Sequence, residues 1–229
     1  MKRTFQCAFA AAALFASSSA FAQDFGKQGQ LAVSAERLFG FSYNSSTTSL
    51  QGGDATTSVT AFSLLSSPVV VGGGKDAWNG YSTPRIAGDY FIIDHLSLGG
   101  ALGYAHWSLT TKAVVGNNES TVSGDTFTFA PRVGYTFAFN DMIGIWPRAG
   151  FTYRSYSSDN VSAHDLALTL EAPFTFNVWP HVVFWGGPTL DLGLTGKANV
   201  DVGNNTTQSY DFNSTEFGIQ TGLLVYFDL

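Results

Sequence analysis

Residues 126–139 have the sequence TFTFAPRVGYTFAF, in which large apolar side chains alternate with small or polar ones. One face of this segment carries Phe127, Phe129, Pro131, Val133, Tyr135, Phe137 and Phe139. The other face carries Thr126, Thr128, Ala130, Arg132, Gly134, Thr136 and Ala138. A period of two residues indicates a β-strand whose two faces lie in different environments.

The next segment, residues 143–156 (IGIWPRAGFTYRSY), repeats the pattern after a tight turn at Asn140-Asp141-Met142. Six further segments alternate as well: 30–43, 81–93, 96–109, 164–178, 182–194 and 216–229. The first three of these alternate less regularly, and Arg37 is an exception on the apolar face of 30–43. The sequence therefore predicts an all-β chain with an eight-stranded, antiparallel, up-and-down barrel.

The connections between these strands differ in length. Three are short, near Asp94, Asp141 and Pro180, and four are long and rich in Ser, Thr, Asn and Gly: 44–80, 110–125, 157–163 and 195–214. Transmembrane barrels of the bacterial outer membrane have short periplasmic turns and longer external loops. With eight strands, both chain ends then lie on the periplasmic side.

The N-terminus has the features of a secretory signal. Lys2 and Arg3 precede an apolar stretch from Cys7 to Ala16, and Ala20-Phe21-Ala22 offers small residues before a cut at Gln23. We expect a signal peptide at 1–22 and one barrel domain at 23–229. Cys7 is the only cysteine, so the mature chain has no disulfide.

The composition favours a lipid-facing surface. Charged residues are 12% of the chain, whereas soluble domains contain about 25%. Without Lys2 and Arg3 the mature chain has 9 basic and 17 acidic side chains, and this acidic balance argues against nucleic acid as a partner. No apolar run after the signal reaches the roughly 20 residues of a membrane helix. Any membrane crossing must therefore use a closed sheet.

The aromatic residues of the apolar face indicate that this face points outward. They gather near both strand ends: Tyr90, Tyr135, Phe137, Phe176 and Phe227 at the turn side, and Phe41, Tyr43, Phe127 and Tyr153 at the loop side. Two such girdles are typical of transmembrane barrels.

The polar face then points into the lumen and carries charges at similar depth. These are Glu36, Arg85, Arg132, Arg148 and Glu171. They have two interpretations: a structural set that must pair because an unpaired buried charge is costly, or a gate in a narrow conduit. We expect carboxylates to hold Arg132 and Arg148, with Glu171 as the first partner.

The chain resembles the small eight-stranded outer-membrane barrels of the OmpA/OmpX/OmpW-like group over essentially its whole mature length. The signal peptide, the eight amphipathic strands, the alternating loop lengths and the terminal alternation from Phe217 to Leu229 carry this resemblance. It implies a monomer in the outer membrane of a Gram-negative bacterium. The partners it implies are membrane lipid, lipopolysaccharide and the barrel-assembly machinery. The group usually ends in an aromatic residue, whereas this chain ends in Leu229, and no peptidoglycan-binding domain follows the barrel.

Few motifs point to chemistry. His106 and Ser108 share a face, as in outer-membrane enzymes that deacylate lipid A, but no acidic partner is identifiable from the sequence, so no enzyme is expected. Gly72-Gly73-Gly74-Lys75 lacks the spacing of a phosphate loop. The four histidines lack metal-ligand spacing, and Asp201 and Asp211 are interpreted as solvated carboxylates rather than a calcium site. We expect no cofactor and no metal.

Two classes of function remain open. The first is a porin-like membrane barrel with a structural role or a role in interactions through its loops. We expect the apolar stretch from Ser58 to Val71 either to extend the barrel strands above the membrane or to contact an apolar ligand or partner. The second is a narrow channel for small solutes, apolar ones among them. A lipid A-modifying enzyme is a remote third alternative.

Overall fold

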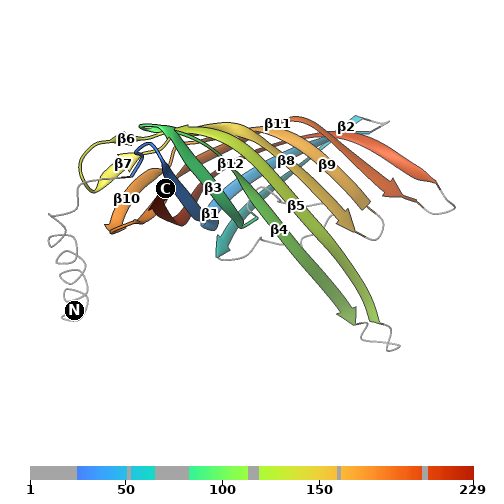
Figure 1. Cartoon of the computed structure of the whole chain (residues 1–229). Coiled ribbons are helices and arrows are strands. Elements are labelled where there is room, and N and C mark those ends of the chain that lie inside the picture. The colour runs from blue at the N-terminus through green and yellow to red at the C-terminus, as the bar shows by residue number, and fades with distance from the viewer. Residues whose placement is uncertain (1–24, 51–52, 65–82, 113–118, 159–160, 203–205) are drawn as a thin grey trace, which may run out of the picture.

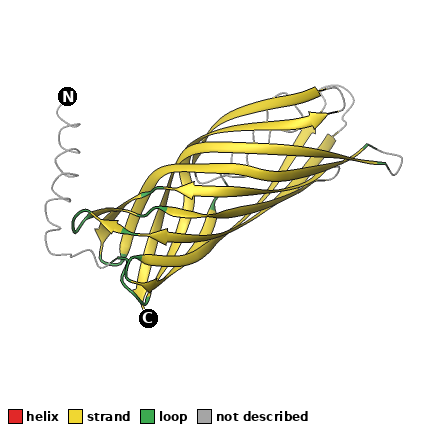
Figure 2. Ribbon diagram, turned by 90° about the horizontal axis from the view of Figure 1, so that it is seen from above, coloured by secondary structure: helices red, strands yellow, loops and turns green. Residues whose placement is uncertain are grey.

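The computed structural model describes residues 25–50, 53–64, 83–112, 119–158, 161–202 and 206–229. The predicted signal peptide at 1–22 and the Gly72–Lys75 motif lie outside these ranges. Strands make up almost all of the described chain (Figure 2). Among the described residues, the structure has no helix that is long and apolar enough to cross a membrane.

The described strands are β1 (Gln30–Leu50), β2 (Gly53–Leu64), β3 (Arg85–Ile93), β4 (Leu96–Lys112), β5 (Glu119–Tyr135), β6 (Phe137–Ala138), β7 (Ile143–Ile145), β8 (Arg148–Ser158), β9 (Val161–Glu171), β10 (Phe174–Trp179), β11 (Val182–Asp201) and β12 (Thr207–Asp228). The barrel wall runs β1-β3-β4-β5-β8-β9-β11-β12, every neighbouring pair is antiparallel, and β12 pairs back with β1. The predicted closed, eight-stranded antiparallel barrel is confirmed (Figure 1).

Three predicted strands are interrupted near the short turns. The pieces β6, β7 and β10 continue the wall beyond β5, β8 and β9 (Figure 1). Two of the breaks coincide with Pro147 and Pro173, which cannot donate to a ladder. The carbonyl groups of both prolines still accept hydrogen bonds from the adjacent segment of the wall. Tyr135 N–H donates to Pro147 O at 3.0 Å, and Trp146 N–H donates to Pro173 O at 2.9 Å. The wall therefore stays bonded across the breaks.

The alternation of burial confirms which face points outward. On β5 from Thr126 to Tyr135 the large apolar residues are exposed and the small or polar ones are buried. Burial alternates with the same period along β9, β11 and β12, and the large side chains buried on β11 and β12, such as Trp185 and Tyr226, lie at the turn-side end. The predicted girdle residues are exposed, except Phe176, which is half-buried. A soluble barrel would have the opposite arrangement, with the large apolar side chains inside.

The predicted long loops are mostly strand, so their boundaries were wrong. Within the segment 44–80, β1 continues to Leu50 and pairs with β2 in an external hairpin, while residues 65–82 lie outside the described chain. The other three long connections shorten to a few residues because β4, β5, β8, β9, β11 and β12 extend into them. A composition rich in Ser and Thr favours a loop when the sequence is considered alone. Thr is also a good strand residue when a second strand pairs with it, so these segments can be strands instead. Thr47 and Thr56, for example, join their hydroxyls across the hairpin at 3.1 Å.

A β-bulge in β1 explains the one residue that broke the pattern. The register with β12 shifts between Glu36 and Phe39, and Arg37 has a φ of 56°. The extra residue turns Arg37 inward beside Glu36, and both side chains are fully buried.

Among the described residues, the pairing of strands around the barrel wall is continuous only in the turn-side half. There β3 joins β1 to β4, but its pairing with β1 ends at Glu36–Arg85, and β2 pairs with β1 from Phe39 onward. Above this level, residues 104–112 of β4 pair with β5 alone. In the described chain no pairing links β2 to β4, and the two hairpins diverge in Figure 1.

Candidate functional site in the lumen

An aromatic floor closes the turn-side end of the lumen. It consists of Phe25, Phe91, Trp146, Trp185 and Tyr226, all buried. The ring of Phe25 lies 5.3 Å from the rings of both Phe91 and Trp146, and 5.5 Å from that of Tyr226. Phe25 precedes the first strand, so the strand pattern did not reveal it.

A glycine places Phe25 in this position. Gly26 has a φ of 101°, and its N–H donates to Gln30 Oε1 at 2.9 Å. A Cβ atom on Gly26 would come within 2.4 Å of Thr136 Oγ1. The turn that folds Phe25 into the barrel therefore needs a residue without a side chain.

A charged layer rests directly on the floor, and Glu36 is its centre. Arg132 donates two hydrogen bonds to this carboxylate, at 2.7 and 2.8 Å. Arg148 Nη1 donates at 2.7 Å and Arg85 Nε at 3.1 Å. Three guanidinium groups from three strands thus converge on one buried carboxylate of β1.

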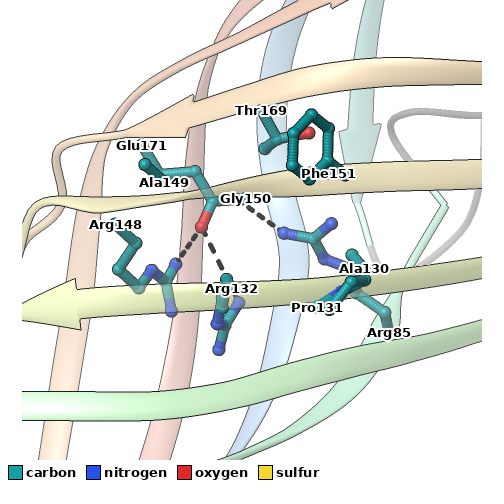
Figure 3. A pocket seen from close by; sticks show the side chains of 10 residues that line it. All are labelled: Arg85, Ala130, Pro131, Arg132, Arg148, Ala149, Gly150, Phe151, Thr169 and Glu171. Carbon is teal, nitrogen blue, oxygen red and sulfur yellow. Dashed lines mark hydrogen bonds and ion pairs between the residues drawn. The ribbon is translucent and has the colours of Figure 1, made fainter.

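Glu171 is the second carboxylate of the layer. It pairs with Arg85, with Arg148 at 2.7 Å and more distantly with Arg132 at 3.7 Å (Figure 3). The structure thus brings all five predicted lumen residues together. The expected order of partners is wrong for Arg132, which hydrogen-bonds Glu36 and Asp89 instead of Glu171.

Three further charged groups belong to the layer and were not singled out from the sequence. Asp89 binds Arg132, with Arg132 Nε donating to Asp89 Oδ1 at 3.0 Å. Arg37 Nη2 donates to Asp191 Oδ2 at 3.1 Å and lies 3.5 Å from Glu171 Oε1. Asp89 and Asp191 occupy inward positions of their strands, so parity could have found them, whereas Arg37 required knowledge of the bulge.

The ion-paired residues of the layer are buried and balance in charge. Its four arginines, Arg37, Arg85, Arg132 and Arg148, face four carboxylates, Glu36, Asp89, Glu171 and Asp191. The guanidinium carbon of Arg148 lies 4.7 Å from the ring centre of Trp146 and 4.8 Å from that of Trp185, which couples the layer to the floor. A cavity of about 10 Å³ remains beside Arg85, Arg148 and Glu171 (Figure 3), which is room for roughly one water molecule.

A second polar cluster lies on the outer wall, where β4 and β5 pair. His106 Nδ1 is 2.9 Å from Asp125 Oδ1, and Tyr104 Oη donates to the same oxygen at 2.6 Å. The side chains of His106 and Asp125 are about half exposed to solvent, at 55% and 51%. The structure therefore gives His106 an acidic partner that the sequence did not identify. Asp125 had been placed in a loop, but the register that pairs Leu96 with Tyr135 runs unbroken to His106 and Asp125.

No metal centre is evident in the part of the chain that the structure describes, since no three His, Cys, Asp or Glu side chains gather to hold an ion.

Comparison with known proteins bears on the fold. No protein-family model matches the chain, and no curated protein matches it. Among solved structures, the outer membrane protein OprG from Pseudomonas aeruginosa aligns with a TM-score of 0.54 at 10% identity, over 89% of this chain and 98% of OprG. Outer membrane protein AlkL, determined in DMPC bilayers, aligns with a TM-score of 0.53 at 14% identity, over 89% of this chain and 92% of AlkL. The chain therefore has the fold of the small eight-stranded outer-membrane barrels.

Proposed function

We propose that this protein is an integral outer-membrane barrel with a closed lumen, whose role is structural or lies in interactions made outside the membrane. The observation that carries the proposal is the packed turn-side lumen of the described chain: an aromatic floor of buried rings below a layer of buried ion pairs. In our proposal these rings and ion pairs stabilise the wall and block an aqueous path through this level.

The arrangement of the ends supports an orientation for this barrel. Leu229 N–H donates to Gly29 O at 3.2 Å, so the last residue lies beside the start of β1, at the end that carries the short turns. In our proposal this end and both termini face the periplasm, after removal of residues 1–22. The strand extensions then point away from the cell.

These extensions supply the surface for interaction. The described side chains of β2 are exposed, including Phe62 at 73%. The hairpins β4–β5 and β11–β12 also project beyond the girdle residues (Figure 1). Rigid paired strands present side chains in fixed positions, which suits recognition better than a flexible loop does.

A second candidate function is a narrow conduit for small solutes, and one observation favours it. Above the ion-pair layer the edges of β2 and of residues 104–112 of β4 have no strand partner within the described chain. A solute that entered the outer lumen could leave sideways through this part of the wall without crossing the charged layer.

Fractionation and osmotic swelling test the two proposals. Mature protein that starts near Gln23 should fractionate with outer membranes and change its gel mobility on heating. Vesicles that contain it should not swell faster in small sugars than empty vesicles. Recovery as a soluble periplasmic species would exclude the membrane barrel. Faster swelling would exclude the closed lumen and favour the conduit.

A further inference from the structure

The outer-wall cluster of Tyr104, His106 and Asp125 includes one more reactive group. Ser108 is the next outward residue of β4 after His106, and its side chain is exposed. Successive residues on one face of a strand lie roughly 7 Å apart. The imidazole ring and the serine side chain can cover that separation by rotation about their χ angles. Ser, His and Asp thus line one stretch of the wall.

The hydrogen bond to Asp125 places a proton on one nitrogen of the imidazole. An ionised carboxylate can only accept, so the bond of 2.9 Å between His106 Nδ1 and Asp125 Oδ1 requires a proton on Nδ1. In the neutral ring, Nε2 is then free to accept a proton. Tyr104 Oη donates to the same carboxylate oxygen and holds Asp125 in place. This is the tautomer that a general base needs when a carboxylate orients it.

The position of the cluster along the wall indicates a substrate. Below it the outward residues of β4 and β5 are apolar, including Leu98, Leu102, Phe129 and Val133. Tyr104 and Phe127 form the next step as a cross-strand pair in the loop-side girdle, and His106, Asp125 and Ser108 follow. Girdles mark the boundary between hydrocarbon and head groups. Membrane lipids carry their acyl esters at this boundary.

We propose that Ser108, His106 and Asp125 form a catalytic triad that hydrolyses an acyl ester of an outer-leaflet lipid. Ser108 Oγ attacks the ester carbonyl carbon while His106 Nε2 takes the hydroxyl proton. The bond to the alcohol oxygen breaks, and His106 returns the proton to that oxygen, which leaves an acyl group on Ser108. Water then attacks the acyl carbon, gives a proton to His106, and the fatty acid leaves as Ser108 regains its proton.

The inference does not depend on a closed lumen, because the three side chains lie on the opposite face of the wall. It differs from an ordinary surface ion pair in three respects: the shared carboxylate oxygen, the hydroxyl at the next outward position and the depth of the cluster. The charged layer inside the lumen offers no such base, because its carboxylates bind guanidinium groups, which stay protonated at neutral pH.

The test uses the whole mature protein folded into vesicles of two kinds. One contains phosphatidylethanolamine and phosphatidylglycerol, and the other contains the same lipids with added lipopolysaccharide. Free fatty acid is measured by mass spectrometry, and an alkyl fluorophosphonate is used to label a reactive serine, which is then mapped. We expect release in at least one vesicle type and a label on Ser108. The vesicle type identifies the source of the ester.

Variants assign the roles. Ser108→Ala should abolish release and labelling, and His106→Ala should lower the rate of release by about 10²–10⁴-fold. Asp125→Asn should lower it by up to about 10⁴-fold, since an amide no longer selects the tautomer. Ser162→Ala is the matched control, because Ser162 is an exposed serine at the same level of β9, and it should leave the rate unchanged. Heat-modifiable mobility verifies that each variant folds.

Two results would overturn the proposal. The first is the absence of both fatty acid release and Ser108 labelling in both vesicle types. The second is release that persists in Ser108→Ala, or a label that maps to Ser123, the residue opposite Ser108.

Discussion

The two halves of this barrel are both built from antiparallel strands, but they differ in how the strands pair and in what lies between them. In the turn-side half each of the eight wall strands β1, β3, β4, β5, β8, β9, β11 and β12 has a partner on both sides, and rings and ion pairs fill the lumen. In the loop-side half the strands continue as hairpins, the β2 and β4 edges are unpaired within the described chain, and a polar cluster lies on the outside. The comparison shows that closure and filling occur together. We expect the turn-side half to supply most of the stability of the fold and the loop-side half to make the contacts with partners.

Matched substitutions of one carboxylate in each half test this contrast most strongly. Glu36→Gln leaves three buried arginines short of their shared partner and should lower the free energy of unfolding in bilayers by about 3–5 kcal/mol. Asp125→Asn, on the outer wall, should leave the denaturant midpoint unchanged, because its partners remain solvated. Reversible urea unfolding followed by Trp fluorescence measures both. Equal effects would show that the lumen layer is not the stabilising element.

A double-mutant cycle sharpens the same point. If Glu36 and Arg148 are coupled, replacing both should cost less than the sum of the two single changes, since neither charge is then left alone. Strict additivity would mean that the bond of 2.7 Å between them contributes little to stability.

An arginine substituted on the outer face should destabilise the half that contacts lipid and have little effect on the half that does not. Val133 lies outward near mid-depth, where arginine in a transmembrane barrel costs about 2–4 kcal/mol. Val202 is half exposed and follows the end of β11 on the extension, and Val202→Arg should change stability by no more than about 0.5 kcal/mol. Folding yield into bilayers and unfolding free energy are compared for the two. If Val133→Arg folds as well as the parent, Val133 does not face lipid.

Two glycines with positive φ give the smallest expected difference. Gly26→Ala forces a Cβ against Thr136, whereas a Cβ on Gly53, in the external hairpin, meets no atom within 4 Å. Both changes strain the backbone, so the difference isolates the contact, and Gly26→Ala should cost about 1–3 kcal/mol more. The thermal unfolding midpoints of the two variants measure this difference. A larger loss for Gly53→Ala would place the tight packing in the wrong half.

The sequence predicted the strand faces well, because a period of two residues is a local signal that the burial of β5 preserves. It also predicted that Glu36, Arg85, Arg132, Arg148 and Glu171 share the lumen face, and the structure places them within one layer. It could not rank their partners, because those distances depend on barrel closure and on side-chain rotamers.

The features missed from the sequence are those set by partners distant in the chain. Composition alone marked the strand extensions as loops, since Ser and Thr occur in both. Arg37 appeared to break the pattern because a bulge cannot be recognised without the register against β12. Asp125 was hidden for the same reason: only the unbroken β4–β5 register brings it opposite His106.

Single-channel recording tests the central claim, the closed lumen, most directly. Folded mature protein is inserted into a planar bilayer and recorded at high salt, with insertion verified by the protein's heat-modifiable mobility after recovery and with an open porin as a positive control. The wild-type protein should give no discrete conductance steps, because the aromatic floor and the ion-pair layer fill the lumen. Reproducible steps of one defined conductance from the wild-type protein would contradict this account.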